Sequence, residues 1–571
     1  MNSFKIFLLI LFVGIGLSAC DNFLAPDEDN QYTYDRILKD PEFAQGIMIN
    51  AYTNLVTAYE FNDVATDDAV TNEQTNSYLR MATGEWTALF DPMNEWSSSY
   101  GSIVNLNYFL SAVDKVEWSW QDSIRNRLFK ERLTAEAKAL RGYYYLLLVT
   151  RYGGVASDGS LLGVPLVNNI LTVKDDWKLP RATFQQTIDQ INSDLDSALL
   201  HLPYKFFDYT GTTPYELAWN KVNGLSQNLN RIDGRVVRAL RARTALLAAS
   251  PAFNGDNYNV ALADSAAKIA GQLLVLNNGL TGFATDRIFW DNDNDITNPE
   301  ILWRTNYVNS NTLESNNYPP TLFGRGRINP TQNLVDAFPM KNGKPIGASG
   351  SGYNSASPYT NRDARLAQNI LVNGATLRST VINTSADSPT NDGLNKLSLY
   401  STRTGYYLLK LLRVTINMNP TATGNARHFY THMRWTEMYL AYAEAANEAF
   451  GPDADPYGFG FTPRTIIAAI RKRATITQPD VYLATIINAA DMRELIRNER
   501  RLELCFEGYR FWDIRRWNLS LTETAKGTSI TAGVHTIVNV ENRVYLPYML
   551  HCPIPYLETK KYSGLLQNAG W

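Results

Sequence analysis

Cysteine is scarce in this chain of 571 residues, which contains Cys20, Cys505 and Cys552 and no others. Three cysteines in a chain of this length do not make the disulfide framework of a small secreted domain. If Cys20 has another use, the remaining two thiols either pair in an oxidising compartment or stay as two separate buried thiols. The sequence leaves both alternatives open.

An excess of charge of one sign is also absent. Charged residues make up 19% of the chain, and its formal net charge is −3. Nucleic-acid-binding domains usually carry a basic face, so the sequence predicts no nucleic-acid partner. The aromatic content of 12%, by contrast, supplies many rings that can lie at a surface.

Motifs of known catalytic chemistry are missing as well. The chain has no glycine-rich phosphate loop, no G-x-S-x-G nucleophile elbow and no G-x-G-x-x-G. His428 and His432 have the i, i+4 spacing of a metal pair, but no Glu follows His428 as it does in zinc peptidases. Residues 291–295 begin like a calcium loop, but Ile296 stands where an EF-hand requires glycine and Leu302 where it requires Glu. We therefore predict no catalytic residue, no metal site and no cofactor.

The N-terminus carries an export signal. An apolar run at residues 6–19 follows Lys5 and ends directly before Cys20. The run is shorter than the roughly 20 apolar residues of a spanning helix. A positive start, a short apolar run and small residues before a cysteine are typical of a bacterial lipoprotein signal. We predict that residues 1–19 are removed, that Cys20 is lipidated and that the acidic segment 20–33 is a tether to a single domain at 34–571.

Helical periodicity recurs in blocks that tend to form pairs. The predicted helices span residues 40–58, 103–113, 129–150, 183–202, 234–249, 259–276, 431–450 and 462–474. Thr183 is a predicted N-cap with Gln186 at the spacing of a capping box. Small residues such as Ala137 and Ala443 recur where paired helices would cross. The pattern predicts a mostly α fold of tetratricopeptide-like helix pairs, with short strands near residues 301–303 and 406–409.

Long stretches without helical or strand periodicity separate these blocks, at about residues 61–101, 206–233, 305–330 and 341–395. They are rich in Asn, Thr, Ser, Gly, Tyr and Pro. Irregular segments of this length are uncommon in a compact domain unless they form a functional surface. We expect the ligand to bind to these insertions.

The densest group of charges lies at residues 493–517. On a helix, Glu499, Glu503 and Glu507 form one i, i+4 stripe and arginines form another, which destabilises an isolated helix. We therefore predict partners from other helices and a structural charge network. The members of that network are Arg497, Glu499, Arg500, Arg501, Glu503, Glu507 and Arg510. A glycosidase acid–base pair is the alternative interpretation, but nearby arginines favour ionised carboxylates.

This charged segment resembles the C-terminal signature of the SusD/RagB family of Bacteroidetes outer-membrane lipoproteins. Other motifs of that family follow in order: AEAKALRGYY at 135–144, YGGV at 152–155, GRV at 234–236, PTQNLVDAF at 330–338, NRDARL at 361–366, RWTEMYL at 434–440 and QNAGW at 567–571. The resemblance implies a mostly helical SusD-like fold with four tetratricopeptide-like helix pairs. It also implies a surface lipoprotein that passes a glycan, or in some members a peptide, to a TonB-dependent SusC-like transporter. The shared motifs build the scaffold and do not identify the ligand.

Sugars have apolar ring faces and polar edges, so a glycan site needs exposed aromatic rings beside Asp, Asn or Arg. The insertion at 61–101 has this composition. The predicted ligand-binding residues are Asp67, Asp68, Tyr78, Trp86, Asn94, Trp96, Tyr100, Trp290 and Tyr318.

We therefore predict a lipid-anchored, non-enzymatic outer-membrane protein that binds an oligosaccharide. Two alternatives remain open at this point. One is a peptide-binding member of the same uptake architecture, and the other is a helical glycoside hydrolase.

Overall fold

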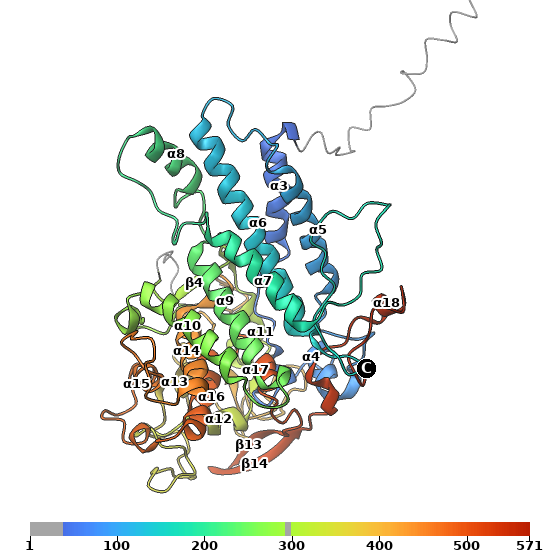
Figure 1. The fold of residues 1–571 in the computed structure, drawn as a ribbon. Coiled ribbons are helices and arrows are strands. Elements are labelled where there is room, and N and C mark those ends of the chain that lie inside the picture. Colours follow the sequence, from blue (N-terminus) through green and yellow to red (C-terminus); the bar gives the residue numbers. More distant parts are fainter. Residues whose placement is uncertain (1–37, 292–297) are drawn as a thin grey trace, which may run out of the picture.

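A computed structural model describes residues 38–291 and 298–571 (Figure 1). The predicted signal, Cys20 and the acidic tether lie outside the described residues, as does the part of the acidic loop from residue 292 onward. Within the described ranges the chain is mostly helical with short strands, which confirms the predicted fold class.

Four groups of packed helices form the scaffold. In these groups α3 (Pro41–Thr53) packs on α5 (Trp96–Ala112), α6 (Ser123–Tyr152) on α7 (Phe184–Leu199), α9 (Gly234–Ala249) on α10 (Val260–Leu276), and α14 (Trp435–Phe450) on α15 (Pro463–Arg473) and α16 (Ala489–Leu504). Successive groups also touch, because α5 packs on α6, α7 on α9, and α10 on α14 (Figure 1). The predicted tetratricopeptide-like pairs therefore form one continuous stack.

Side-chain caps fix where these helices begin. The Thr183 hydroxyl accepts the backbone N–H of Gln186 at 3.1 Å, and the Gln186 side chain accepts the backbone N–H of Thr183 at 2.9 Å, which confirms the predicted capping box. Asp40, Asp122 and Asn259 cap α3, α6 and α10 in the same way. Each cap satisfies a backbone donor that the first helical turn leaves unpaired.

Small residues and one buried ion pair hold the second pair together. A Cβ at Gly142 of α6 would lie 3.1 Å from the side chain of Leu195 on α7, so only glycine permits this approach without displacement. One residue earlier, the guanidinium of Arg141 donates to Asp194 of α7 at 2.6 and 2.8 Å. Close approach and ion pairing thus fix the register of the two helices.

The strands form small antiparallel pairs. The described sheets pair β1 (Ala69–Thr71) with β6 (Ile328–Pro330), β2 (Gly154–Val155) with β3 (Leu161–Leu162), β4 (Ile301–Arg304) with β12 (Thr431–Arg434), β5 (Val308–Ser310) with β11 (Ala426–His428), β7 (Ile370–Leu371) with β10 (Tyr407–Leu408), β8 (Thr376–Leu377) with β9 (Thr380–Val381), and β13 (Ala525–Thr531) with β14 (Val534–Glu541). Shorter helices complete the described chain: α4 (Ser77–Arg80), α8 (Pro214–Asn223), α11 (Thr312–Asn317), α12 (Gln332–Ala337), α13 (Ala364–Asn369), α17 (Arg510–Arg516) and α18 (Tyr556–Thr559). Strands β4 and β10 confirm the two predicted strand positions.

Several predicted boundaries are wrong. The helix predicted at 40–58 ends at Thr53, the helix predicted at 129–150 spans Ser123–Tyr152, and the stretch at 206–233 that we expected to be irregular contains α8. Residues 431–434 are strand β12 rather than helix, because they pair with β4 before α14 begins at Trp435. The helix predicted from residue 103 begins at Trp96, inside the segment that we expected to be irregular. The first turn of α5 shows little amphipathic periodicity in the sequence. Its helical conformation comes from burial against the neighbouring helices.

Candidate ligand-binding site

The predicted aromatic platform at residues 61–101 is not exposed. Trp86 is 2% exposed and Trp96 is 6% exposed. The Trp86 indole N–H donates to Asp91 at 2.9 Å, and its ring contacts Phe511 and Trp571 edge to face. These rings belong to the core of the helical stack, so the expectation that they form a surface is wrong.

Four other predicted site residues are already engaged within the protein. Asp67 and Asp68 pair with Arg501 at 2.8 and 2.5 Å. The side-chain oxygen of Asn94 accepts a hydrogen bond from Tyr152 at 2.9 Å, and the Tyr100 hydroxyl donates to a backbone carbonyl at 2.8 Å. These contacts join the segment to the scaffold.

The remaining three predicted ligand residues lie in different places. Trp290 and Tyr318 are both buried, and the Tyr318 hydroxyl donates to the Arg413 carbonyl at 2.7 Å. Tyr78 is half-buried, and its hydroxyl donates to Glu60 at 2.6 Å. None of the nine predicted residues lines the open cleft described below, although Tyr78 donates to Glu60, which does line it.

The predicted charge network does meet in the interior. Glu503 lies within 3.1 Å of Arg365 and Arg473, and Glu507 lies 2.6 Å from Lys410 and 2.8 Å from Arg434. Burial alone would raise the pKa of Glu503, but Arg473 and Arg365 outweigh burial and hold that pKa well below its usual range. Carboxylates held ionised in this way are poor candidates for the general acid of a glycosidase.

The other members of the network have different partners. Glu499 pairs with Arg471 at 2.7 Å, and Arg500 pairs with Asp513 at 2.7 Å. Arg501 and Arg510 both reach Asp67 at 2.8 Å, which links α16 and α17 to the N-terminal half of the chain. Arg497 differs from the rest, because its ion pair is with the exposed Glu494 of its own helix at 3.0 Å.

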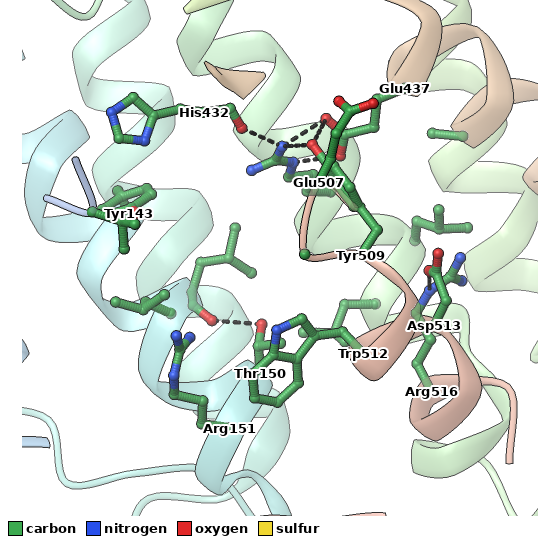
Figure 2. Close-up of a pocket in the computed structure, with 18 of the residues that line it drawn as sticks. Tyr143, Thr150, Arg151, His432, Glu437, Glu507, Tyr509, Trp512, Asp513 and Arg516 are labelled. Carbon is green, nitrogen blue, oxygen red and sulfur yellow. Dashed lines mark hydrogen bonds and ion pairs between the residues drawn. The ribbon is translucent and has the colours of Figure 1, made fainter. Parts of the chain in front are cut away.

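A cavity of about 230 Å³ lies between the helical stack and the C-terminal segment. Figure 2 shows Tyr143 and Arg151 on one side of this cavity and Tyr509, Trp512 and Asp513 on the other. The cavity therefore lies inside the scaffold.

Ion pairs occupy most of the charged groups of this cavity. Arg243 donates to Glu437 and to the Tyr509 hydroxyl at 2.6 and 2.9 Å, and Tyr509 donates to Glu437 at 2.9 Å (Figure 2). Burial and the charge of Arg243 lower the pKa of His432 to about 3, so this imidazole is neutral at physiological pH. Within the described residues, the three carboxylates that line the cavity, those of Glu437, Glu507 and Asp513, are each in an ion pair.

His428 and His432, whose i, i+4 spacing in the sequence is that of a metal-binding pair, lie on different strands. His428 ends β11 and contacts Glu314 at 3.2 Å, whereas His432 lies in β12 and stacks on Trp303. The described residues contain no group of three or more His, Cys, Asp or Glu side chains placed to hold a metal. Cys505 and Cys552 are both buried and unpaired with each other, which settles the alternative left open by the sequence.

An open cleft of about 570 Å³ lies between two of the small sheets. Thr71 and Ile328, which face each other across the β1–β6 ladder, line one side. Val308 and His428, which face each other across the β5–β11 ladder, line the other side. Strand pairing thus brings together three segments that are distant in the sequence.

Apolar side chains form one wall of this cleft. Tyr59, Phe61 and Phe429 contribute rings, with the centroids of Tyr59 and Phe61 6.4 Å apart. The guanidinium of Arg304 lies 4.6 Å from the centroid of the Phe429 ring and supports it from behind the lining. Phe429 is half-buried, so part of its ring faces the open space.

Polar side chains also line the cleft. Arg327 is held by Glu73 at 3.6 Å and by the side-chain oxygen of Asn72 at 3.2 Å. Arg325 is exposed, and within the described residues its guanidinium has no carboxylate partner. Asn316 and Glu60 also line the cleft. The cleft therefore combines aromatic surface with donors and acceptors that remain available.

Two family models match the chain. The model described as "SusD family" matches residues 288–571, and the model described as "Starch-binding associating with outer membrane" matches residues 23–218. The chain belongs to the SusD/RagB family. Within residues 38–291 and 298–571, no helix of this SusD-like protein combines the length and apolar composition of a membrane span.

Known relatives of this SusD-like protein are distant in sequence. A SusD-like protein of Formosa agariphila is 24% identical over 289 residues, a match that spans 48% of this chain and 49% of the relative. A SusD-like protein of Bacteroides fragilis has a TM-score of 0.73 at 22% identity, covering 94% of this chain and 98% of its own. A SusD-like carbohydrate-binding protein of the same organism has a TM-score of 0.71 at 20% identity, covering 93% of this chain and all of its own. These similarities show that the fold is shared.

Sequence reasoning missed the cleft of this SusD-like protein for a structural reason. Residues 308–328 fall within the predicted irregular stretch 305–330 and residues 61–76 within the stretch 61–101, so much of the lining was in segments expected to be functional. The segments at 57–76 and 428–429 carry no signal of their own that connects them to it. Only strand pairing reveals that the three segments share one cleft.

Proposed function

We propose that this SusD-like protein binds an oligosaccharide in the cleft between the β1–β6 and β5–β11 sheets. The observation that carries the proposal is that the partly exposed ring of Phe429 and the guanidinium of Arg325, which has no ion-pair partner among the described residues, line one open space. A pyranose ring offers an apolar face for stacking and hydroxyl groups around its edge, and the aromatic and polar side chains of the lining match these two features.

The polar lining supports binding by hydrogen bonds. Arg325 and Asn316 supply donors to ring and hydroxyl oxygens, and the carboxylates of Glu60 and Glu73 accept from sugar hydroxyls. Glu73 is fixed by Arg327, so little ordering is required of it when a ligand arrives. An oligosaccharide that spans the cleft would displace water from both walls at once.

We propose no chemical step. Glu60 accepts a hydrogen bond from Tyr78, and Glu73 is paired with Arg327, so each carboxylate of the cleft has a structural partner. The carboxylates of the charge network are buried among arginines and do not line the cleft. This arrangement supports a protein that releases its ligand unchanged.

We also propose that the protein is located at the cell surface. Lipidation of Cys20, and delivery of the ligand to a TonB-dependent SusC-like transporter, rest on the N-terminal signal and on the family. The match to the model described as associating with the outer membrane supports this placement. A lipid anchor would keep the cleft beside the transporter that receives the ligand.

An array of oligosaccharides and peptides tests the proposed ligand class. We expect the purified mature protein to be retained by at least one family of oligosaccharides and by none of the peptides. Arg325→Ala should lose this retention, whereas Arg127→Ala, a change at an exposed arginine of α6, should keep it. Separation of the products after incubation should show the bound oligosaccharide unaltered.

Three results would contradict the proposal. Retention by peptides alone would favour the peptide-binding alternative. New, shorter products that appear with sustained turnover would favour the hydrolase alternative. Equal retention of wild type and Arg325→Ala would move the site away from the cleft.

A further inference from the structure

The chain segment 204–231 forms an excursion that packs against the outside of α6. Its helix, α8, lies beside the N-terminal half of α6 (Figure 1). Ala218 and Val222 of α8 are buried against Leu128 of α6, and these three residues form a small apolar cluster of their own. Aliphatic contacts therefore attach the excursion to the scaffold.

Four aromatic rings gather on this excursion. We call Phe207, Tyr209, Tyr215 and Trp219 the α8 platform. The Trp219 ring is central, with its centroid 5.2 Å from that of Phe207, 5.7 Å from that of Tyr209 and 6.1 Å from that of Tyr215. Phe207 is 40% exposed and Tyr215 is 39% exposed, so the rings are not a hidden core.

The excursion holds the platform in place through its backbone. The Trp219 indole N–H donates to the Phe207 carbonyl at 3.2 Å. The Asn220 side chain accepts from the backbone N–H of Tyr209 at 2.7 Å and donates to its carbonyl at 2.8 Å. Thr213 and Glu216 form a capping box that starts α8 immediately beside the platform. The rings are therefore ordered before any ligand arrives, which lowers the entropy cost of binding.

Polar side chains of the same excursion remain unused. Within the described residues, the hydroxyls of Tyr209 and Tyr215 make no hydrogen bond, and the side chains of Asp208 and Lys221 have no partner. One carboxylate and one ammonium group balance each other in charge. A strongly cationic rim, which an anionic lipid surface would favour, is absent from this set.

We propose that the α8 platform is a second carbohydrate-binding surface, which takes pyranose rings of a polysaccharide whose other part occupies the cleft. Partly exposed Tyr, Trp and Phe rings with free Tyr hydroxyls, and a free carboxylate in the same segment, match the apolar face and polar rim of a sugar. The choice of carbohydrate as the ligand class rests on the proposed function. The position of the site rests on the α8 platform alone, because none of its residues lines the cleft.

A polysaccharide that contacts both the cleft and the α8 platform should bind more tightly than a short oligosaccharide that contacts the cleft alone. The second contact forms at the high effective concentration that the first one creates, so it strengthens binding of a long polymer and not of a short oligosaccharide. Loss of one stacking contact should weaken polymer binding on the order of tenfold, by analogy with the stacking of bases on aromatic side chains.

Affinity electrophoresis tests this inference, in gels that contain amylopectin, laminarin, xylan, galactomannan, pectin or alginate. We expect at least one polymer to retard the wild type, and Tyr215→Ser to lose about ninety per cent of the apparent affinity for that polymer. Leu217→Ser is the matched control, because Leu217 lies on the same helix, is 51% exposed and has no part in the ring cluster. Asp208→Asn is a second variant that weakens the polar edge without touching the rings.

A hexasaccharide of the same polymer separates the two proposals. It should bind Tyr215→Ser as it binds the wild type, and it should fail to bind Arg325→Ala. If Tyr215→Ser and Asp208→Asn are both retarded like the wild type, the second surface is refuted while the cleft proposal stands. If Arg325→Ala keeps hexasaccharide binding, the cleft proposal fails independently of the α8 platform. If no polymer retards the wild type while the oligosaccharide array still shows retention that depends on Arg325, the second surface is refuted and the cleft proposal stands.

Discussion

The Glu503 carboxylate lies among three buried guanidinium groups, those of Arg365 and Arg473 at 3.1 Å and of Arg434 at 3.8 Å. Such a group is costly to break, because removal of one partner leaves the other charges buried and uncompensated. The network joins α13, β12, α15 and α16, so it holds the last helices of the stack against the insertions.

Glu503→Ala should therefore lower the free energy of unfolding by about 3–5 kcal/mol. Glu494→Ala is the matched control on the same helix, since Glu494 is exposed and pairs only with Arg497 in the described structure. Denaturant unfolding of both variants measures the difference. A Glu503→Ala protein as stable as Glu494→Ala would show that the network contributes little.

Asp63 is a second buried carboxylate, but it has no arginine partner in the described residues. Burial, and then the neighbouring Asp68, raise the pKa of Asp63 from 3.8 to about 7. The folded protein therefore binds a proton that the unfolded chain releases at lower pH. The stability that this proton contributes is complete below about pH 4 and is lost as the pH rises through 7.

Asp63→Asn should remove that loss, because an amide stays neutral and its oxygen can still accept the backbone N–H of Phe506. We expect the variant to gain thermal stability relative to wild type as the pH rises from 5 to 8. Thermal unfolding across this range measures the gain, with the exposed Asp208→Asn as control. A difference between Asp63→Asn and wild type that does not change with pH would refute the explanation.

At the scale of single residues, the sequence predicts that charged side chains need partners better than it predicts whether an aromatic ring is buried or exposed. Like charges at i, i+4 spacing require partners from elsewhere, so the network around Glu503 and Glu507 was predictable. Trp86 and Trp96 have the composition of a sugar site around them, yet they are core residues. A tryptophan suits a buried position and a binding surface equally well, and only the packing distinguishes the two.

Among the elements, the helices with clear periodicity were predicted best. Helix α9 spans the predicted residues 234–249, and α10 begins one residue after its predicted start at residue 259. The cleft was not predictable at this scale, because β1 and β5 are three-residue strands whose partners, β6 and β11, lie far along the chain. Short strands carry too little pattern to reveal which segment they join.

Thr183→Ala tests the contribution of a cap to the stack. The change removes the hydroxyl that accepts the backbone N–H of Gln186 in the first turn of α7, which packs on α6 and α9, and should lower the free energy of unfolding by about 1 kcal/mol. Thr53→Ala, in the exposed last turn of α3, is the control and should have little effect. Equal stability of the two variants would mean that tertiary packing alone fixes the start of α7.

For the whole molecule, the helical stack is a scaffold that presents loops and short sheets, and our proposal is that lipidation of Cys20 anchors this scaffold to the membrane. Cys20→Ala should give protein that is unprocessed or found in the soluble fraction. Labelling with radioactive fatty acid and membrane fractionation measure this, and Cys505→Ala should still be labelled. Label and outer-membrane partitioning that persist in Cys20→Ala would refute the anchor.

The central claim is that the cleft binds an oligosaccharide through Phe429 and Arg325. Calorimetric titration of the best-retained oligosaccharide into wild type, Phe429→Ala and Arg325→Ala tests it most directly, with thermal unfolding of the same samples and with Arg127→Ala as control. The account predicts that each cleft variant stays folded and binds roughly tenfold or more weakly, since a stacking contact or a charge-assisted hydrogen bond is lost. Folded Phe429→Ala and Arg325→Ala proteins with wild-type affinity would contradict it.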